Sequence, residues 1–311
     1  MFKKTILLIA ALALAALILI VPAWPGTLPT SIVPDGARWV AHLDMEKFVA
    51  TKLYEYLEKD GRFEIKSRDL SRWFKIDVPK DVTSLTVFGL ELRHDLGMNM
   101  ATVFAVAGKF DKACLLALIA LDKEHQETAY GAYTLYSTGS DEYGAFINDG
   151  LIVFSENREA VEKVLDTAAG KTKNFASSKL NAAFKDISSG TFLSGVVTDF
   201  AGLGKQINQS KLIEKAGMMF FLAQEKQDIF QVRLQVTADS PENAKNMADM
   251  AQGLIAMARL GQGESHGAIP SSLVDGLQVK LEGKIVRLEL DMPSREVANM
   301  ASRGRGLDFF D

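Results

Sequence analysis

The stretch "LQVKLEGKIVRLELDMP", residues 277–293, decides the fold class of this chain. Two strand-like runs meet at Gly283, which predicts an antiparallel hairpin. Helical runs flank the hairpin. Residues 240–260 begin with a serine cap and a proline in the first turn, and residues 294–304 follow the second strand. Because hairpins join neighbouring strands directly, this pattern favours antiparallel sheets covered by helices.

The same order of elements occurs twice along the chain. Each half predicts a strand, a helix, two paired strands, a helix, two paired strands and a final helix. The first half has these elements at 37–44, 45–60, 82–92, 100–110, 111–125, 128–138, 143–155 and 157–169. The second half has them at 190–200, 201–216, 218–227, 229–238, 240–260, 273–283, 284–293 and 294–304. Two matching series of elements indicate a structural duplication.

The predicted fold class is α+β, with two related halves at residues 37–170 and 189–305. Each half is expected to be an antiparallel sheet with helices on one face. We derive it from the ferredoxin-like unit, duplicated, with an added strand and helix in each copy. The alternative is one continuous sheet made by both halves side by side. Residues 171–188 form the expected linker and residues 306–311 a C-terminal tail, and fold likeness implies no activity.

Residues 1–24 predict export of the protein. Two lysines precede an unbroken apolar run from Ile6 to Val21. The core of a signal peptide has about 7–15 residues and a membrane-spanning helix about 20, so this run falls between them. We expect an N-terminal membrane anchor in preference to a cleaved signal peptide. In both cases the lysines stay cytoplasmic and the body is periplasmic or otherwise extracytoplasmic, held away from the membrane by a proline-rich spacer at 25–36.

Composition excludes several classes of partner and site. With 35 basic and 39 acidic side chains, the formal net charge of −4 gives no electrostatic footprint for nucleic acid. Cys114 is the only cysteine, so an intramolecular disulfide is impossible, and its leucine-rich surroundings predict a buried, inert thiol. The segments 165–172 and 199–206 resemble phosphate-binding loops but lack the first glycine. No nucleotide and no cofactor is expected.

His42 and Asp44 share one face of the strand predicted in "WVAHLD", residues 39–44. An active site would need that arrangement. However, Asp44 lies where the strand passes into a helix, and Asp199 has the matching position in the second half. A carboxylate there can accept hydrogen bonds from the first free helix amides. We therefore predict that Asp44 caps a helix and that His42 has no role common to both halves.

Two further sets of residues are candidates for chemistry. An enzyme would use His42, Asp44 and His94, brought together only by the fold. A copper site would use His94, Met98 and Met100, because exported copper proteins use such soft ligands. For the second set, a hairpin turn followed by apolar strand residues is the simpler interpretation.

Tyrosines gather between residues 128 and 143. Taken as one strand, residues 128–138 place Tyr130 and Tyr136 on the same face, where they would form part of an interaction surface. Tyrosine also favours strands for its packing, so an ordinary structural role is the alternative.

The segments "VPDGARWVAHLDMEKF" (33–48) and "IDVPKDVTSLTVFG" (76–89) resemble uncharacterised exported proteins of the bacterial envelope. The resemblance implies export and an envelope location and carries no catalytic set. Together these features lead us to expect a membrane-tethered, non-catalytic binding protein of the bacterial cell envelope, with a protein or glycan partner. An enzyme, for instance a hydrolase, and a periplasmic copper-binding protein are the alternatives.

Overall fold

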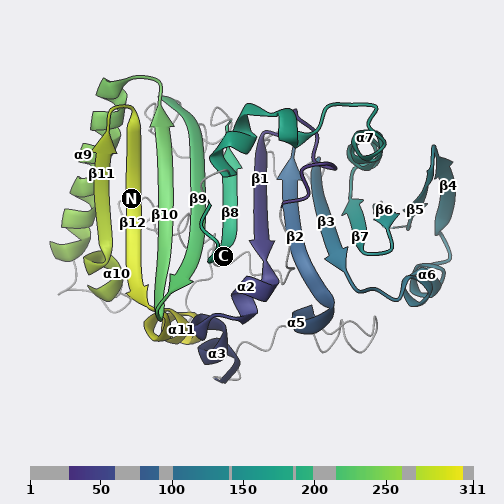
Figure 1. Cartoon of the computed structure of the whole chain (residues 1–311), viewed down its shortest axis with the longest axis horizontal. Helices are drawn as coiled ribbons and strands as arrows, with labels where there is room; N and C mark the ends of the chain where they lie inside the picture. The colour runs from purple at the N-terminus through teal and green to yellow at the C-terminus, as the bar shows by residue number, and fades with distance from the viewer. Residues whose placement is uncertain are drawn as a thin grey trace.

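The structure is a computed structural model, and it describes residues 28–59, 78–90, 101–139, 142–184, 187–198, 215–260 and 271–303. Its strands form one antiparallel sheet of twelve strands in the order β11-β12-β10-β9-β8-β1-β2-β3-β7-β6-β5-β4 (Figure 1). Helices lie around the sheet, so the predicted α+β class with antiparallel strands is confirmed.

The strands are β1 (Trp39–Asp44), β2 (Val82–Gly89), β3 (Thr102–Gly108), β4 (Gln126–Tyr130), β5 (Tyr133–Ser137), β6 (Tyr143–Asn148), β7 (Leu151–Ser155), β8 (Thr191–Val197), β9 (Ala216–Lys226), β10 (Ile229–Ala238), β11 (Leu277–Glu282) and β12 (Ile285–Pro293). The α-helices are α2 (Met45–Val49), α3 (Lys52–Lys59), α5 (Val78–Asp81), α6 (Lys112–Ile119), α7 (Arg158–Ala168), α9 (Pro241–Leu260), α10 (Ser271–Asp275) and α11 (Ser294–Arg303). Two short 3-10 helices are η1 (Phe175–Ser177) and η2 (Lys179–Phe184).

Both halves of the chain contribute to this one sheet, as in the alternative arrangement expected from the sequence. The first strands of the two halves, β1 and β8, pair with each other at its centre. Outward from that pair, the order β1-β2-β3-β7-β6 corresponds to β8-β9-β10-β12-β11. The ferredoxin-like derivation is not confirmed. In a ferredoxin-like unit another strand lies between the two strands that a helix connects. Here the first two strands of each half, β1 with β2 and β8 with β9, pair directly with each other.

The first half has two strands more than predicted, because residues 128–138 and residues 143–155 are each a hairpin and not a single strand. The chain turns at Gly131, whose φ of 60° lies in the left-handed region that glycine adopts without steric cost. Tyr130 pairs with Tyr133 across this two-residue loop. A glycine with positive φ at the first loop position is typical of a type II′ turn. The hairpin β4–β5 extends the sheet to its outer edge.

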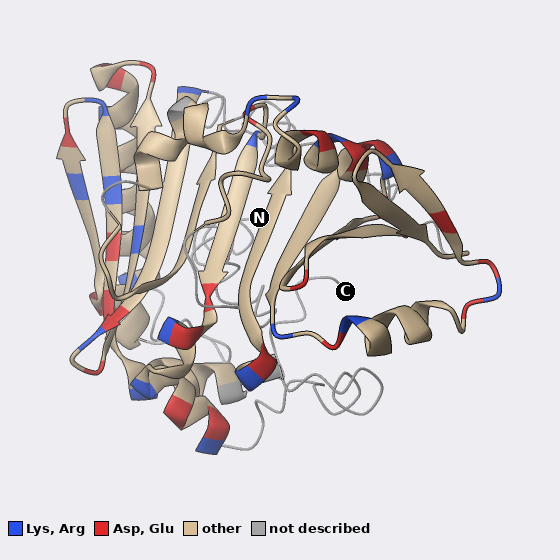
Figure 2. Cartoon of the chain, turned by 45° about the vertical axis from the view of Figure 1, so that its right-hand side comes forward, with Lys and Arg blue, Asp and Glu red and all other residues tan. Residues whose placement is uncertain are grey.

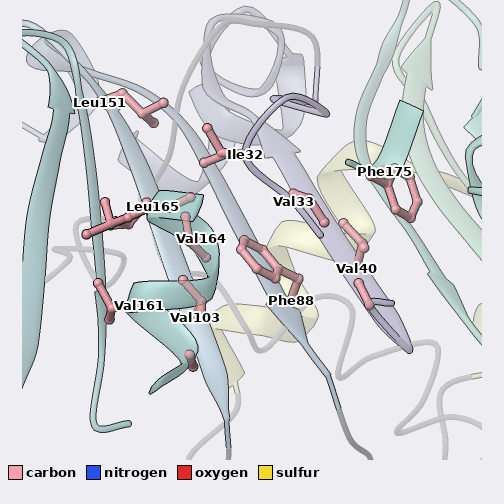
Figure 3. Close-up of a cluster of buried hydrophobic side chains, with 14 of the residues drawn as sticks. Ile32, Val33, Val40, Phe88, Val103, Leu151, Val161, Val164, Leu165 and Phe175 are labelled. Atoms are coloured by element: carbon pink, nitrogen blue, oxygen red, sulfur yellow. The ribbon is translucent and has the colours of Figure 1, made fainter. Parts of the chain in front are cut away.

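One face of the sheet, here named face B, carries Val40 and its cross-strand partner Phe88. Over β1–β3 and β5–β7, face B is covered by α7, the 3-10 helices and the segment before β1, which together form a dense apolar core (Figure 3). The largest side chains of this core are fully buried, among them Phe88, Leu165 and Phe175. Over β10–β12, face B instead carries polar and charged side chains such as Arg233 and Glu289.

The other face, here named face A, carries Leu43 and its partner Leu85. Helices α2, α3, α10 and α11 cover one end of face A. Helix α9 covers face A over strands β10, β12 and β11. Helices in the first half therefore lie on both faces, and the prediction that they lie on one face is wrong for that half. The reason is that strands such as β3, "TVFAVAG", are apolar on both faces, so each face needs a cover.

The segment before β1 is part of the folded body from Leu28 onward. Ile32 and Val33 are fully buried in the core on face B. Pro34 forms an isolated bridge with Asn174, and the Phe175 amide donates to the Val33 carbonyl at 2.7 Å. The described end of the predicted spacer is therefore packed against the segment that joins the two halves.

The β9–β10 turn contains strain that a substitution can relieve. Gln227 and Asp228 have φ values of 53° and 63°, a conformation that costs about 1–2 kcal/mol for an ordinary L-residue. We expect Gln227→Gly to raise the free energy of unfolding by about 0.5–1 kcal/mol, measured by urea denaturation. Gly283→Ala places a side chain at a φ of 57° and should lower it. A Gln227→Gly protein that is less stable than the parent contradicts the argument.

Candidate binding surface

His42 lies in the middle of β1 on face B, with Thr86 opposite it on β2 and Ser194 opposite it on β8. Its Nδ1 is 2.9 Å from the Thr86 hydroxyl oxygen, and the residue is 6% exposed. His42 is therefore a buried histidine with a hydrogen-bond partner, in a row of polar side chains. Burial of this degree leaves little room for a substrate to reach the ring.

Asp44 is the N-cap of α2, as the sequence predicted. Its Oδ1 accepts from the Lys47 amide at 3.2 Å, and its Oδ2 is 2.8 Å from the Lys47 ammonium. Asp44 has extended backbone angles, so the last residue of β1 is also the first cap of the helix. The short stretch around Asp44 is thus a strand passing into a helix.

We expect Asp44→Ala to lower the free energy of unfolding by about 0.5–2 kcal/mol, the usual range for a lost N-cap. Asp44→Asn keeps an oxygen acceptor and should recover most of that loss. Chemical denaturation of the three proteins measures the difference. If Asp44→Asn loses as much stability as Asp44→Ala, the cap is not what Asp44 contributes.

The remaining candidate ligands cannot be placed against these residues. His94, Met98 and Met100 lie outside the described residues, so the copper hypothesis and the set His42, Asp44 and His94 stay predictions. Among the residues that the structure describes, no group of three or more histidine, cysteine, aspartate or glutamate side chains could hold a metal ion. Cys114, predicted to be buried, is only partly buried on α6.

Tyr130 and Tyr136 lie on opposite faces, because the turn at Gly131 separates them. Tyr130 is on face B, where its hydroxyl donates to Asp166 of α7 at 3.0 Å. Burial and this hydrogen bond raise the pKa of Tyr130. Tyr136 is on face A, edge-on to Phe146 at 6.0 Å between ring centroids. The prediction that Tyr130 and Tyr136 share a face is wrong. The hydrogen bond from Tyr130 to Asp166 connects β4 to α7.

The carboxylate of Glu225, in the second half, connects the two halves on face A of the sheet. Glu225 of β9 accepts from the amides of Lys52 and Leu53 at 2.6 and 2.8 Å, and from the Ser294 hydroxyl at 2.6 Å. It therefore caps α3, which belongs to the first half, and holds the start of α11. The Tyr56 hydroxyl, also on α3, donates to Asp228 at 3.1 Å. These contacts occupy the polar groups of this seam.

Helix α6 is the least covered apolar element that the structure describes. Its sequence, "KACLLALI", has one charged residue, and only Leu115 is buried. Leu121, just beyond the end of α6, is 74% exposed. Asp111 caps the helix by accepting from the Cys114 amide at 2.9 Å. A helix that is apolar all round is normally surrounded by protein. In α6, Ala113 and Ala117 are exposed and most other apolar residues are only partly buried, so the helix presents a partly covered apolar surface.

Face A continues that surface over strands β2, β3 and β5–β7. Phe154 of β7 stacks on Phe104 of β3 with a centroid distance of 5.2 Å and is 43% exposed. On the same face Leu85 and Phe146 are buried, but five other residues are only partly buried. They are Val87, Phe104, Val106, Tyr136 and Ile152. We name these five residues, together with Phe154, Leu121 and α6, the apolar surface.

The apolar surface lies in an uncharged part of the sheet. Strands β2, β3, β5, β6, β7 and β8 contain no lysine, arginine, aspartate or glutamate. Most charged side chains of the sheet lie on β9, β10, β11 and β12 at the other side (Figure 2). Outside these strands the charged strand residues are Asp44 of β1 and Glu127 of β4. Lys112 of α6, at 4.9 Å from the centroid of the Phe146 ring, is a cation at the border of the surface. The arrangement suits contact with an apolar partner.

The fold and this surface define an α+β protein built on one open antiparallel sheet, with part of one face left half-covered. No protein-family model and no curated protein matches the chain. Solved structures of TP0453 share the fold. Crystal form I superimposes with a TM-score of 0.51 at 11% identity, over 89% of this chain and 98% of that one. Crystal form III gives 0.50 at 12% identity, over 89% and 99%.

At such identity the likeness to TP0453 shows the fold alone. None of the described helices is long and apolar enough to cross a membrane. Residues 1–24, where the anchor or signal peptide is predicted, lie outside the described residues.

Sequence reasoning missed the apolar surface. The leucine-rich run at 111–125 predicts a helix with a buried Cys114, and that prediction gave no indication of an exposed apolar helix. The available signal was its position: Asp111 lies directly before the helix, and Asp122 and Lys123 follow its apolar run after Ala120 and Leu121. These residues mark an exposed connection at both ends and leave little neighbouring chain to cover the helix.

Proposed function

We propose that the protein is an extracytoplasmic, membrane-tethered binding protein without catalytic activity, which holds a protein partner on the apolar surface. The observation that carries this proposal is α6, apolar on all sides with one buried residue. Leu121 and Phe154 add exposed area beside it. Exposed apolar patches of this kind mark interaction sites, because leaving them in water costs about 25 cal/mol for each Å².

Binding is favoured over catalysis by the state of the candidate residues. Asp44 is engaged through both carboxylate oxygens, and His42 is buried with a hydrogen-bond partner. Neither faces the apolar surface, because both lie on face B. A protein partner is favoured over a glycan because the surface offers few hydrogen-bonding groups, and a sugar presents many hydroxyls that need them.

Export and tethering are proposed from residues 1–24, with their two lysines and apolar run. The test is the intact mass of the protein purified from cell membranes, together with its cleavage by a protease added outside the cytoplasmic membrane. A full-length mass and external cleavage are expected. A chain beginning near Trp24 contradicts the tether, and protection from the external protease contradicts export.

The partner surface is tested by substitution and co-purification. Phe154→Asp and Leu121→Asp place a carboxylate in the apolar surface, and each should abolish recovery of the partner after cross-linking in native membranes. Leu281→Asp is the matched control, because Leu281 is 43% exposed, like Phe154, but lies on β11. Thermal unfolding should show that all three variants are folded. Loss of the partner in Leu281→Asp alone, or in none of them, overturns the proposal.

We also propose that the two halves arose by duplication of a five-stranded unit. The support is the corresponding strand order on either side of the β1–β8 pair. Helices α6 and α9 follow corresponding strands, although the last helices, α7 and α11, pack on different faces. An experimental structure tests this: β1, β2, β3, β7 and β6 should superimpose on β8, β9, β10, β12 and β11. Failure to superimpose rejects the duplication.

A further inference from the structure

Strand β4 ends the sheet on the side of the first half. Its five residues, "QETAY", pair with β5 on one side, and no other described strand pairs with it on the other side (Figure 1). Such an edge presents backbone amides and carbonyls that can accept another strand. We propose that β4 is the docking strand for a second copy of this chain, through antiparallel β4–β4 pairing. This inference is independent of the proposed partner on the apolar surface.

The hairpin register fixes which backbone groups point outward. In antiparallel pairs, residues that exchange hydrogen bonds alternate with residues that do not. The two-residue loop is closed by the pair Tyr130–Tyr133, and the next hydrogen-bonded pair is Thr128–Leu135. The amides and carbonyls of Glu127 and Ala129 therefore point away from β5, toward the open edge.

The outward amides and carbonyls of Glu127 and Ala129 can hydrogen-bond to the same groups of a second β4 strand. When two β4 strands meet antiparallel with Thr128 at the two-fold axis, Glu127 of each lies opposite Ala129 of the other. Both residues offer outward groups, so each such pair exchanges both backbone hydrogen bonds. Thr128 of one copy lies opposite Thr128 of the other, and a cross-strand threonine pair stabilises antiparallel strand pairing. A register centred on Glu127 would place two carboxylates opposite each other, which disfavours it.

The edge lacks the features that normally prevent such pairing. β4 contains no lysine, no proline and no bulge, whereas the opposite edge strand, β11, contains Lys280 and is packed against α9. Glu127 and Ala129 are exposed, and so is Leu121 in the connection that leads into β4.

Disulfide trapping tests the register in the full-length chain, in native membranes and in a Cys114→Ala background. At the two-fold axis, Thr128 faces its copy as a non-hydrogen-bonded pair, whose Cα separation of about 4.5 Å suits a disulfide. Thr128→Cys should therefore give a covalent dimer under mild oxidation. The matched control is Leu281→Cys, on the opposite edge strand, which should remain monomeric.

Charge exchange, made in the Thr128→Cys protein, tests the same register a second time. Adding Ala129→Glu to Thr128→Cys places two carboxylates opposite each other and should abolish the dimer. Adding Glu127→Lys as well restores opposite charges and should restore it. The proposal is overturned if Thr128→Cys remains monomeric, links to a different protein, or links as strongly with Ala129→Glu. Dimers formed equally by Leu281→Cys also overturn it.

Discussion

Glu225→Ala should lower the free energy of unfolding by about 2–4 kcal/mol, one of the two largest single-residue effects that we expect. Hydrogen bonds to a charged group contribute about 1.5–3 kcal/mol each, and Glu225 accepts from the amides of Lys52 and Leu53 and from the Ser294 hydroxyl. Because Glu225 is partly exposed to solvent, its total contribution is smaller than the sum of three such hydrogen bonds. The next free amide of α3, that of Tyr54, is satisfied by the Thr51 hydroxyl at 3.0 Å. Without Glu225, the first two amides of the helix lose their acceptor.

The controls separate the cap from the charge. Glu225→Gln keeps one carbonyl oxygen and should lose about half as much stability. Glu58→Ala removes an exposed carboxylate from the same helix and should change stability by less than about 0.5 kcal/mol. Urea denaturation with a single transition measures all three. Equal effects of Glu58→Ala and Glu225→Ala would falsify the assignment of Glu225 as the cap.

The sequence predicts elements well where local chemistry decides them. The cap at Asp44 follows from a strand, a carboxylate and a helix in immediate succession, and the structure contains that contact. The hairpin at 277–293 follows from two strand-like runs around Gly283. In both cases the interacting residues are near neighbours in sequence, so no knowledge of the fold is needed.

Prediction fails where a contact joins distant parts of the chain. Glu225 and Lys52 are 173 residues apart, and nothing in either local sequence points to the other. The side of the sheet on which α7 packs is a further case, because β3 is apolar on both faces and permits either choice. Tyr130 shows a third case: its face depends on the hairpin turn at Gly131, and one missed turn reverses the assignment.

The two faces of the sheet can be compared through one pair of phenylalanines. Phe88 on β2 faces the core of face B and has no exposed surface, whereas Phe154 on β7 lies on face A and is 43% exposed. Phe88→Ala deletes a ring from a closely packed region around Val40 and Val103, and the neighbours can refill the space only partly. The cost therefore contains both the lost burial and the cavity.

We expect Phe88→Ala to lower the free energy of unfolding by about 3–5 kcal/mol, and Phe154→Ala by no more than about 1 kcal/mol. Partner binding should show the opposite order. Phe154→Ala removes a ring from the apolar surface and should weaken recovery of the cross-linked partner, while Phe88→Leu, which keeps the core filled, should leave recovery unchanged. Denaturation and co-purification of the same three proteins measure both properties. If Phe154→Ala destabilises the protein as much as Phe88→Ala, then Phe154 belongs to the core, and face A is not the binding surface.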